Sequence, residues 1–223
     1  MSRCGLIAAL IFAAVIGLLF GIFPDLDLKI AALFYDPATG KFPLRTNSLL
    51  GFFRDAMSWL LVIVAAPAAL SLLVPLATSR LKPWMSARAA IFLLATLLLA
   101  PGLLVNVVLK GHWSRPRPVA VVEFGGVERF VPWWDPRGQC RHNCSFVAGE
   151  ASSGFWMLAP ASLAPPSWRL LAYVAATALG IGMGIVRMAM GAHFFSDVAF
   201  AGIFTFLIIW LAHRVIFRDK PPS

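Results

Sequence analysis

The sequence predicts an all-α membrane protein whose helices cross the bilayer several times. Three observations support this: hydrophobic residues make up 60% of the 223 residues, only 13% are charged, and long uncharged runs recur along the chain. A soluble domain has about 45–50% apolar and about 25% charged residues. So little polar surface argues against a soluble enzyme and against a disordered protein. At this length we expect residues 1–223 to form a single domain.

Six segments are candidate spans, because a helix needs about 20 apolar residues to cross the bilayer core. Three uncharged runs come first, then a shorter pair, then a final run that contains one aspartate. They are residues 5–24, 56–79, 89–109, 151–168, 170–186 and 193–213. The first run is long for a signal peptide and further spans follow it, so we interpret it as a retained helix.

The basic residues near the span ends suggest the orientation. With six spans, the short connections and both termini share one side of the membrane, and the positive-inside rule makes that side cytoplasmic. The basic residues on this side are Arg3, Arg80, Lys82, Arg88, Arg169, Arg214, Arg218 and Lys220. Two long loops, residues 25–55 and 110–150, then lie outside. These loops are also rich in Lys and Arg, but long loops are a weak topology signal.

Smaller features add local expectations. Residues 25–34 alternate apolar and charged side chains and form either a short interfacial helix or a loop with apolar anchors. Gly180 and Gly184 are four residues apart within the fifth span, which favours close helix packing.

The three cysteines have different settings. Cys140 and Cys144 lie four apart in the second outer loop, and an oxidising compartment would allow a disulfide; two unpaired thiols are the alternative. A zinc site needs more ligands than this pair and His142 supply. Cys4 is expected to be a free thiol.

Six polar residues gather at the outer ends of spans three to six if the chain alternates direction. They are Lys110, Arg117, Glu150, Arg187, His193 and Asp197. Polar groups at membrane depth are costly, so they suggest a functional site. Each has a structural alternative. A basic side chain can anchor a helix end, and a His–Asp pair can be structural. Glu150 can be a negative charge at a helix N-terminus that the helix dipole favours.

The chemistry of this group favours phosphoryl transfer. Three cations would hold a dianion, and they would stabilise charge on its equatorial oxygens without a metal. His193 and Asp197 are four apart and share a helix face. An aspartate bound to one ring nitrogen would leave the other free to attack phosphorus. Glu150 could protonate the leaving oxygen.

These residues resemble the motifs of the type 2 phosphatidic acid phosphatase superfamily. The first motif, Lys, six residues, Arg-Pro, matches residues 110–118. The third, Ser-Arg, five residues, His, three residues, Asp, matches residues 186–197, with Val186 in place of serine. The resemblance implies six spans, a phosphohistidine on His193 oriented by Asp197, and phosphate bound by Lys110, Arg117 and Arg187.

The second motif, Pro-Ser-Gly-His, is altered. The best match is residues 145–152, where Gly149 would help to bind phosphate and Glu150 replaces the histidine. A rival match at residues 152–155 ends in Phe155, which cannot move a proton. Cations would lower the pKa of Glu150 and burial would raise it. His112, His142 or unaided departure of the leaving group are the alternatives to Glu150.

A narrower resemblance, to the bacterial lipid A 4′-phosphatase branch, comes from residues 101–106, the cysteine-containing loop, residues 144–147 and residues 191–197. It implies hydrolysis of the 4′-phosphate of lipid A at the periplasmic face of the inner membrane, with no cofactor, no metal and no obligatory protein partner. The basic residues form no tract for nucleic acid. Alternatives are a polyprenyl diphosphate or phosphatidylglycerophosphate phosphatase, a lipid phosphotransferase, and, less favoured, an anion transporter or a pseudoenzyme.

Overall fold

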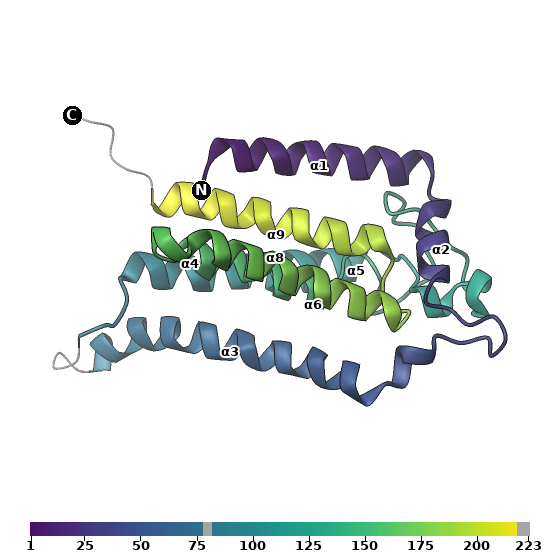
Figure 1. Cartoon of the computed structure of the whole chain (residues 1–223), viewed down its shortest axis with the longest axis horizontal. Helices are drawn as coiled ribbons and strands as arrows, with labels where there is room; N and C mark the ends of the chain where they lie inside the picture. The colour runs from purple at the N-terminus through teal and green to yellow at the C-terminus, as the bar shows by residue number, and fades with distance from the viewer. Residues whose placement is uncertain (78–81, 218–223) are drawn as a thin grey trace.

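The computed structural model of the chain describes residues 1–77 and 82–217. Within these residues it consists of helices and loops, with two isolated bridge pairs, so the predicted all-α fold is confirmed. The long helices run side by side, and short helices and loops cover one end of the bundle (Figure 1). Arg80, Arg218, Lys220 and the last residues of the predicted 56–79 span lie outside the described residues.

The elements are long helices and short ones. The long ones are α1 (Arg3–Ile22), α3 (Ser48–Ala77), α4 (Ala87–Leu97) with its π-helical continuation η2 (Leu98–Leu109), α8 (Pro166–Ala189) and α9 (Phe195–Ile216). The short ones are α2 (Asp25–Ala32), η1 (Pro43–Thr46), α5 (Lys110–His112), η3 (Pro118–Ala120), η4 (Val122–Phe124), α6 (Gly149–Trp156) and α7 (Leu158–Ser162).

Five helices of the described chain are long and apolar enough to cross a membrane. They are Arg3–Ile22, Ser48–Pro75, Ala87–His112, Pro166–Ala189 and Phe195–Ile216. The third of these joins α4, η2 and α5. Five of the six predicted segments therefore form helices of spanning length.

The predicted span at 151–168 is not one long helix. It begins as α6, breaks at Met157, continues as α7 and ends before Pro166 starts α8. Pro160 lacks a backbone N–H, which weakens the helix just after the break. Trp156 and Ala159 are fully buried, so these short helices lie inside the bundle and are shielded by the longer ones.

Hydrogen bonds and glycines hold α6 in place. The indole of Trp156 donates to Thr96 of α4 at 3.0 Å, and Ser152 bonds Thr205 of α9 at 2.8 Å. A Cβ on Gly180 would overlap the ring of Phe155, so α8 approaches α6 closely at this point. The predicted close packing of the fifth span is therefore confirmed.

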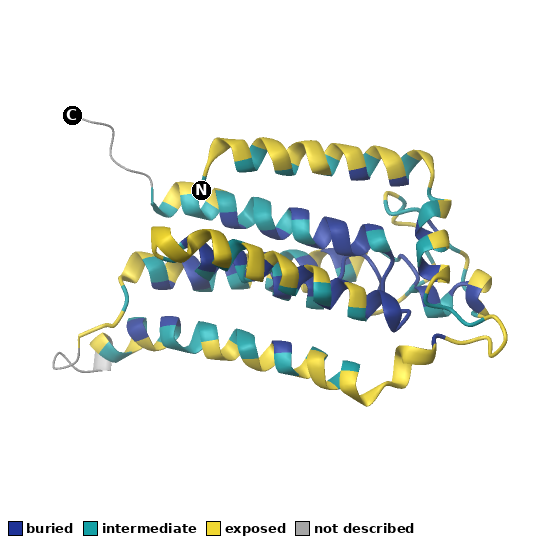
Figure 2. Ribbon diagram, viewed as in Figure 1, coloured by how far each residue is buried: buried dark blue, intermediate teal, exposed yellow. Residues whose placement is uncertain are grey.

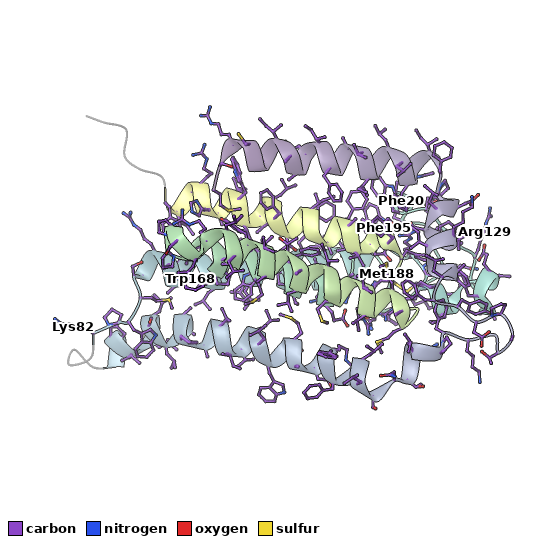
Figure 3. The ribbon with its side chains drawn as sticks, viewed as in Figure 1. Phe20, Lys82, Arg129, Trp168, Met188 and Phe195 are labelled. Carbon is purple, nitrogen blue, oxygen red and sulfur yellow. A yellow bond between two sulfur atoms is a disulfide. The ribbon has the colours of Figure 1, made fainter. Side chains whose placement is uncertain are left out.

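The core is concentrated towards the end of the bundle where the short helices lie. Burial is densest in α6 and the first turns of α9, whereas α1 and α3 expose much of their surface (Figure 2). Phe20 of α1 stacks on Phe195 of α9, with ring centroids 5.2 Å apart (Figure 3). Residues 25–32 form the helix α2, which is one of the two structures expected for this segment. Asp27 is buried in this helix.

Candidate active site

The six polar residues expected to share one face meet at one end of the bundle. The end of α8, the starts of α6 and α9, and α5 all lie there, beside the loops (Figure 1). Glu150 lies 3.3 Å from the guanidinium of Arg187 and 3.8 Å from the ring of His193. Lys110 and Arg117 are near enough for their charges to act on one another and on Glu150.

His193 is held by a backbone carbonyl. Its ring is fully buried, and Nδ1 lies 2.7 Å from the carbonyl oxygen of Ser145. A carbonyl only accepts hydrogen bonds, so Nδ1 carries a proton, and in the neutral ring Nε2 keeps its lone pair. Nε2 has no hydrogen-bond partner and faces Glu150. This is the arrangement that a nucleophilic imidazole requires.

Asp197 does not orient the ring in the way expected from the sequence. Its Oδ2 lies 3.8 Å from His193 Nδ1, which is too long for a hydrogen bond. Oδ2 instead accepts from the hydroxyl of Ser145 at 2.5 Å and from the backbone N–H of Phe194 at 2.8 Å. Asp197 therefore fixes the residue that holds the histidine, because Ser145 offers its hydroxyl to the acid and its carbonyl to the ring.

Arg115 connects Asp197 to α2 in a network that sequence reasoning missed. Its fully buried guanidinium donates to Asp197 at 2.6 Å, to Ser196 at 2.8 Å and to Asp27 at 2.8 Å. Asp27 also accepts from the backbone N–H and the hydroxyl of Ser196. The only hint in the sequence was a second Arg-Pro pair, at residues 115–116, within the first motif.

The cations line the space in front of the histidine. A Cβ on Gly149 would lie 2.8 Å from Nζ of Lys110, so the missing side chain lets the ammonium rest against the start of α6. The first N–H groups of a helix have no partner within it and can bind anionic oxygens. Burial and the neighbouring charge of Arg187 lower the pKa of Arg117. Arg117 itself donates to the backbone oxygen of Asn143 at 3.0 Å and to its side chain at 2.8 Å.

Glu150 lies among the charged residues of the site. Burial alone would raise the pKa of its carboxyl, but a protonated His193 ring and the charges of Arg187 and Lys110 lower it well below its usual range. One of its oxygens is buried without a hydrogen-bond partner. The side chain is therefore a carboxylate that lies beside these cations.

The other candidate acids are placed less well. His112 is exposed and its Nδ1 bonds the carbonyl of Val108, and His142 is also exposed. Phe155 packs against Gly180 and Gly202, away from the phosphate-binding residues. The structure therefore favours the alignment that contains Glu150 over the one that ends at Phe155.

The outer loop contains a disulfide and no metal cluster among the described residues. Cys140 and Cys144 are joined, with Cα atoms 5.7 Å apart, and they bracket Asn143, which holds Arg117. Cys4 is free and exposed. Across residues 1–77 and 82–217, no group of three or more His, Cys, Asp or Glu is positioned to hold a metal ion.

Comparison with known proteins agrees with this geometry. The model of the PAP2 superfamily matches residues 88–221. A lipid A 4′-phosphatase of Francisella tularensis subsp. novicida is 39% identical over 222 residues, which are 99% of this chain and 99% of the relative. No solved structure matches.

Two further relatives align over part of their length. Lipid A 4′-phosphatases of Rhizobium leguminosarum and Rhizobium etli are each 41% identical over 124 residues, or 56% of this chain. The aligned part is 50% of the first and 45% of the second.

Proposed function

Because this chain belongs to the PAP2 superfamily, we propose that it is a membrane phosphatase that removes the 4′-phosphate of lipid A. The observation that carries the proposal is the unpartnered Nε2 of His193, which faces Glu150 beside the cations Arg187, Lys110 and Arg117. We infer the identity of the lipid substrate from the relative that is 39% identical over almost the whole chain. The partner is thus a phosphorylated lipid in the bilayer.

The chemistry runs in two displacements on phosphorus. Nε2 of His193 attacks, the bond from phosphorus to the sugar oxygen breaks, and a phosphohistidine forms. Water then attacks the phosphohistidine and releases inorganic phosphate. Lys110, Arg117 and Arg187 stabilise the charge on the equatorial oxygens, and Nδ1 stays bonded to the Ser145 carbonyl throughout.

Glu150 supplies and recovers the proton. When the phosphate dianion binds, it pairs with Arg187 and Lys110, which otherwise lie beside Glu150. It also adds negative charge next to the carboxyl. Both effects raise the pKa of Glu150 and favour its protonation. The neutral acid then protonates the leaving sugar oxygen. As a carboxylate again, it accepts a proton from the attacking water.

We propose that this site faces the periplasm, in the outer leaflet of the inner membrane. In this arrangement α6 and α7 complete a sixth crossing inside the bundle, which reverses the chain between α5 and α8. The start of α1, the start of α8 and the end of α9, which contain Arg3, Arg169 and Arg214, lie at the opposite end of the bundle from the site (Figure 1). The positive-inside rule assigns that end to the cytoplasm.

Phosphate release from purified lipid A in detergent tests the function. Activity should persist in EDTA, because the basic side chains neutralise the charge of the phosphate. His193→Ala should abolish activity. His142→Ala, at an exposed histidine of the outer loop, is the matched control. Mass spectrometry should locate the lost phosphate on the distal sugar. Full activity of His193→Ala refutes the mechanism. Faster turnover of undecaprenyl diphosphate or phosphatidylglycerophosphate refutes the substrate.

A further inference from the structure

A cavity of about 500 Å³ lies among the outer loops beside the candidate active site. Its volume is typical of sites for small organic groups, which run from about 300 to 1,000 Å³. The polar side chains that line it come from the segment before α3: Asp36, Thr39, Lys41, Arg45 and Thr46. Phe42, Phe124 and Val119 form its apolar wall.

This cavity shares a wall with the active site. The N–H of Val119 donates to the carbonyl of Gly191 at 3.1 Å, and Gly191 comes two residues before His193. A Cβ on Gly191 would lie 2.6 Å from both Phe42 and Val119. On the other side, Arg45 is close enough for its charge to act on Arg117. The cavity is therefore adjacent to the residues proposed to bind the phosphate.

The lining mixes donors with acceptors. Lys41 and Arg45 only donate, the two threonine hydroxyls do both, and the Asp36 carboxylate only accepts. Asp36 already caps its turn by accepting from Ala38 at 3.0 Å and Thr39 at 2.7 Å, and each oxygen retains a free lone pair. A bare phosphate would be repelled by Asp36, whereas a sugar ring offers hydroxyls that both give and receive hydrogen bonds.

We propose that this cavity binds the glycosyl part of the lipid headgroup, with Lys41 and Arg45 as residues that determine specificity. The proposal rests on the function proposed above and adds the position of the sugar. Discrimination then depends on the headgroup: a sugar lipid gains contacts in the cavity, and a glycerolipid phosphate of similar charge gains none.

Binding to the inactive His193→Ala protein tests the proposal without depending on turnover. Lipid A and phosphatidic acid are titrated against this protein in detergent, with and without Lys41→Gln and Arg45→Gln together. Affinity for lipid A should fall about tenfold or more, because two charge-assisted hydrogen bonds are lost. Affinity for phosphatidic acid should stay within about twofold. Lys29→Gln, which removes an exposed lysine of α2 outside the cavity, is the control.

The outcomes separate this proposal from the proposed function. An equal loss for both lipids, or no loss for lipid A, overturns the headgroup site even if the wild-type protein hydrolyses lipid A. A selective loss supports the site. The phosphate-release assay is separate from this binding experiment. If the wild-type protein does not hydrolyse lipid A in that assay, the result counts against the proposed function.

Discussion

Ser145 links the acid Asp197 to the imidazole of His193: its hydroxyl donates to Asp197 at 2.5 Å, and its own carbonyl holds Nδ1 at 2.7 Å. The acid and the ring are themselves 3.8 Å apart. The orientation of the nucleophile thus depends on the backbone of residue 145, and the acid acts on that backbone through the serine side chain.

Ser145→Ala tests this relationship. The variant keeps the carbonyl and removes the hydroxyl, so Asp197 loses a buried hydrogen bond and residue 145 loses its anchor. A hydrogen bond to a charged group contributes about 1.5–3 kcal/mol, so kcat should fall about 10- to 100-fold while KM changes little. Ser153→Ala in α6 is the control. Wild-type kcat in Ser145→Ala would show that the serine does not position the ring.

Arg115→Met should destabilise the protein strongly. The fully buried guanidinium pairs with Asp27 and Asp197, and removing one partner of a buried pair costs about 3–5 kcal/mol because a charge is left unpaired. Equilibrium unfolding in SDS–detergent mixtures measures the loss. Arg54→Met breaks an exposed pair with Asp55 and should cost less than about 1 kcal/mol. Equal effects of the two variants would contradict the structural role of Arg115.

Glu150→Gln should alter the response of stability to acid. The pKa of Glu150 is lowered in the folded protein, so the carboxylate contributes its full stability above the ordinary pKa of 4.5. That contribution is lost as the pH falls below this value. Melting temperatures measured from about pH 6 down to about pH 3 should therefore fall less in Glu150→Gln than in the wild type. Glu123→Gln, at an exposed carboxylate, serves as the control, and parallel curves for all three proteins would refute the expectation.

Opening the disulfide should weaken phosphate binding more than catalysis. Cys140 and Cys144 enclose Asn143, which accepts two hydrogen bonds from Arg117. In Cys140→Ser with Cys144→Ser this loop is free to move, so Arg117 is less well placed and KM should rise several-fold with kcat nearly unchanged. Cys4→Ser, at the free and exposed thiol, should match the wild type. A fall in kcat at constant KM would contradict this role of the loop.

Motif spacing predicted which charged residues come together, because a topology of alternating spans brings the ends of neighbouring helices to one side. Lys110, Arg187 and His193 lie at such ends and could be placed together before any coordinates were known. The length of the fourth segment could not be predicted from hydropathy alone. Residues 151–162 are mostly buried among other helices, and composition does not separate that reason for an apolar segment from contact with lipid.

The sequence by itself determined the helical membrane class, the charged residues that gather at one end of the bundle and the altered second motif, since composition and spacing are local properties of the chain. Only the tertiary structure decided what supports them. Asp27 and Arg115 are 88 residues apart, and Ser145 and Asp197 are 52 apart. No local pattern pairs such residues, because their partnership exists only once α2, the outer loop and α9 pack into one buried network.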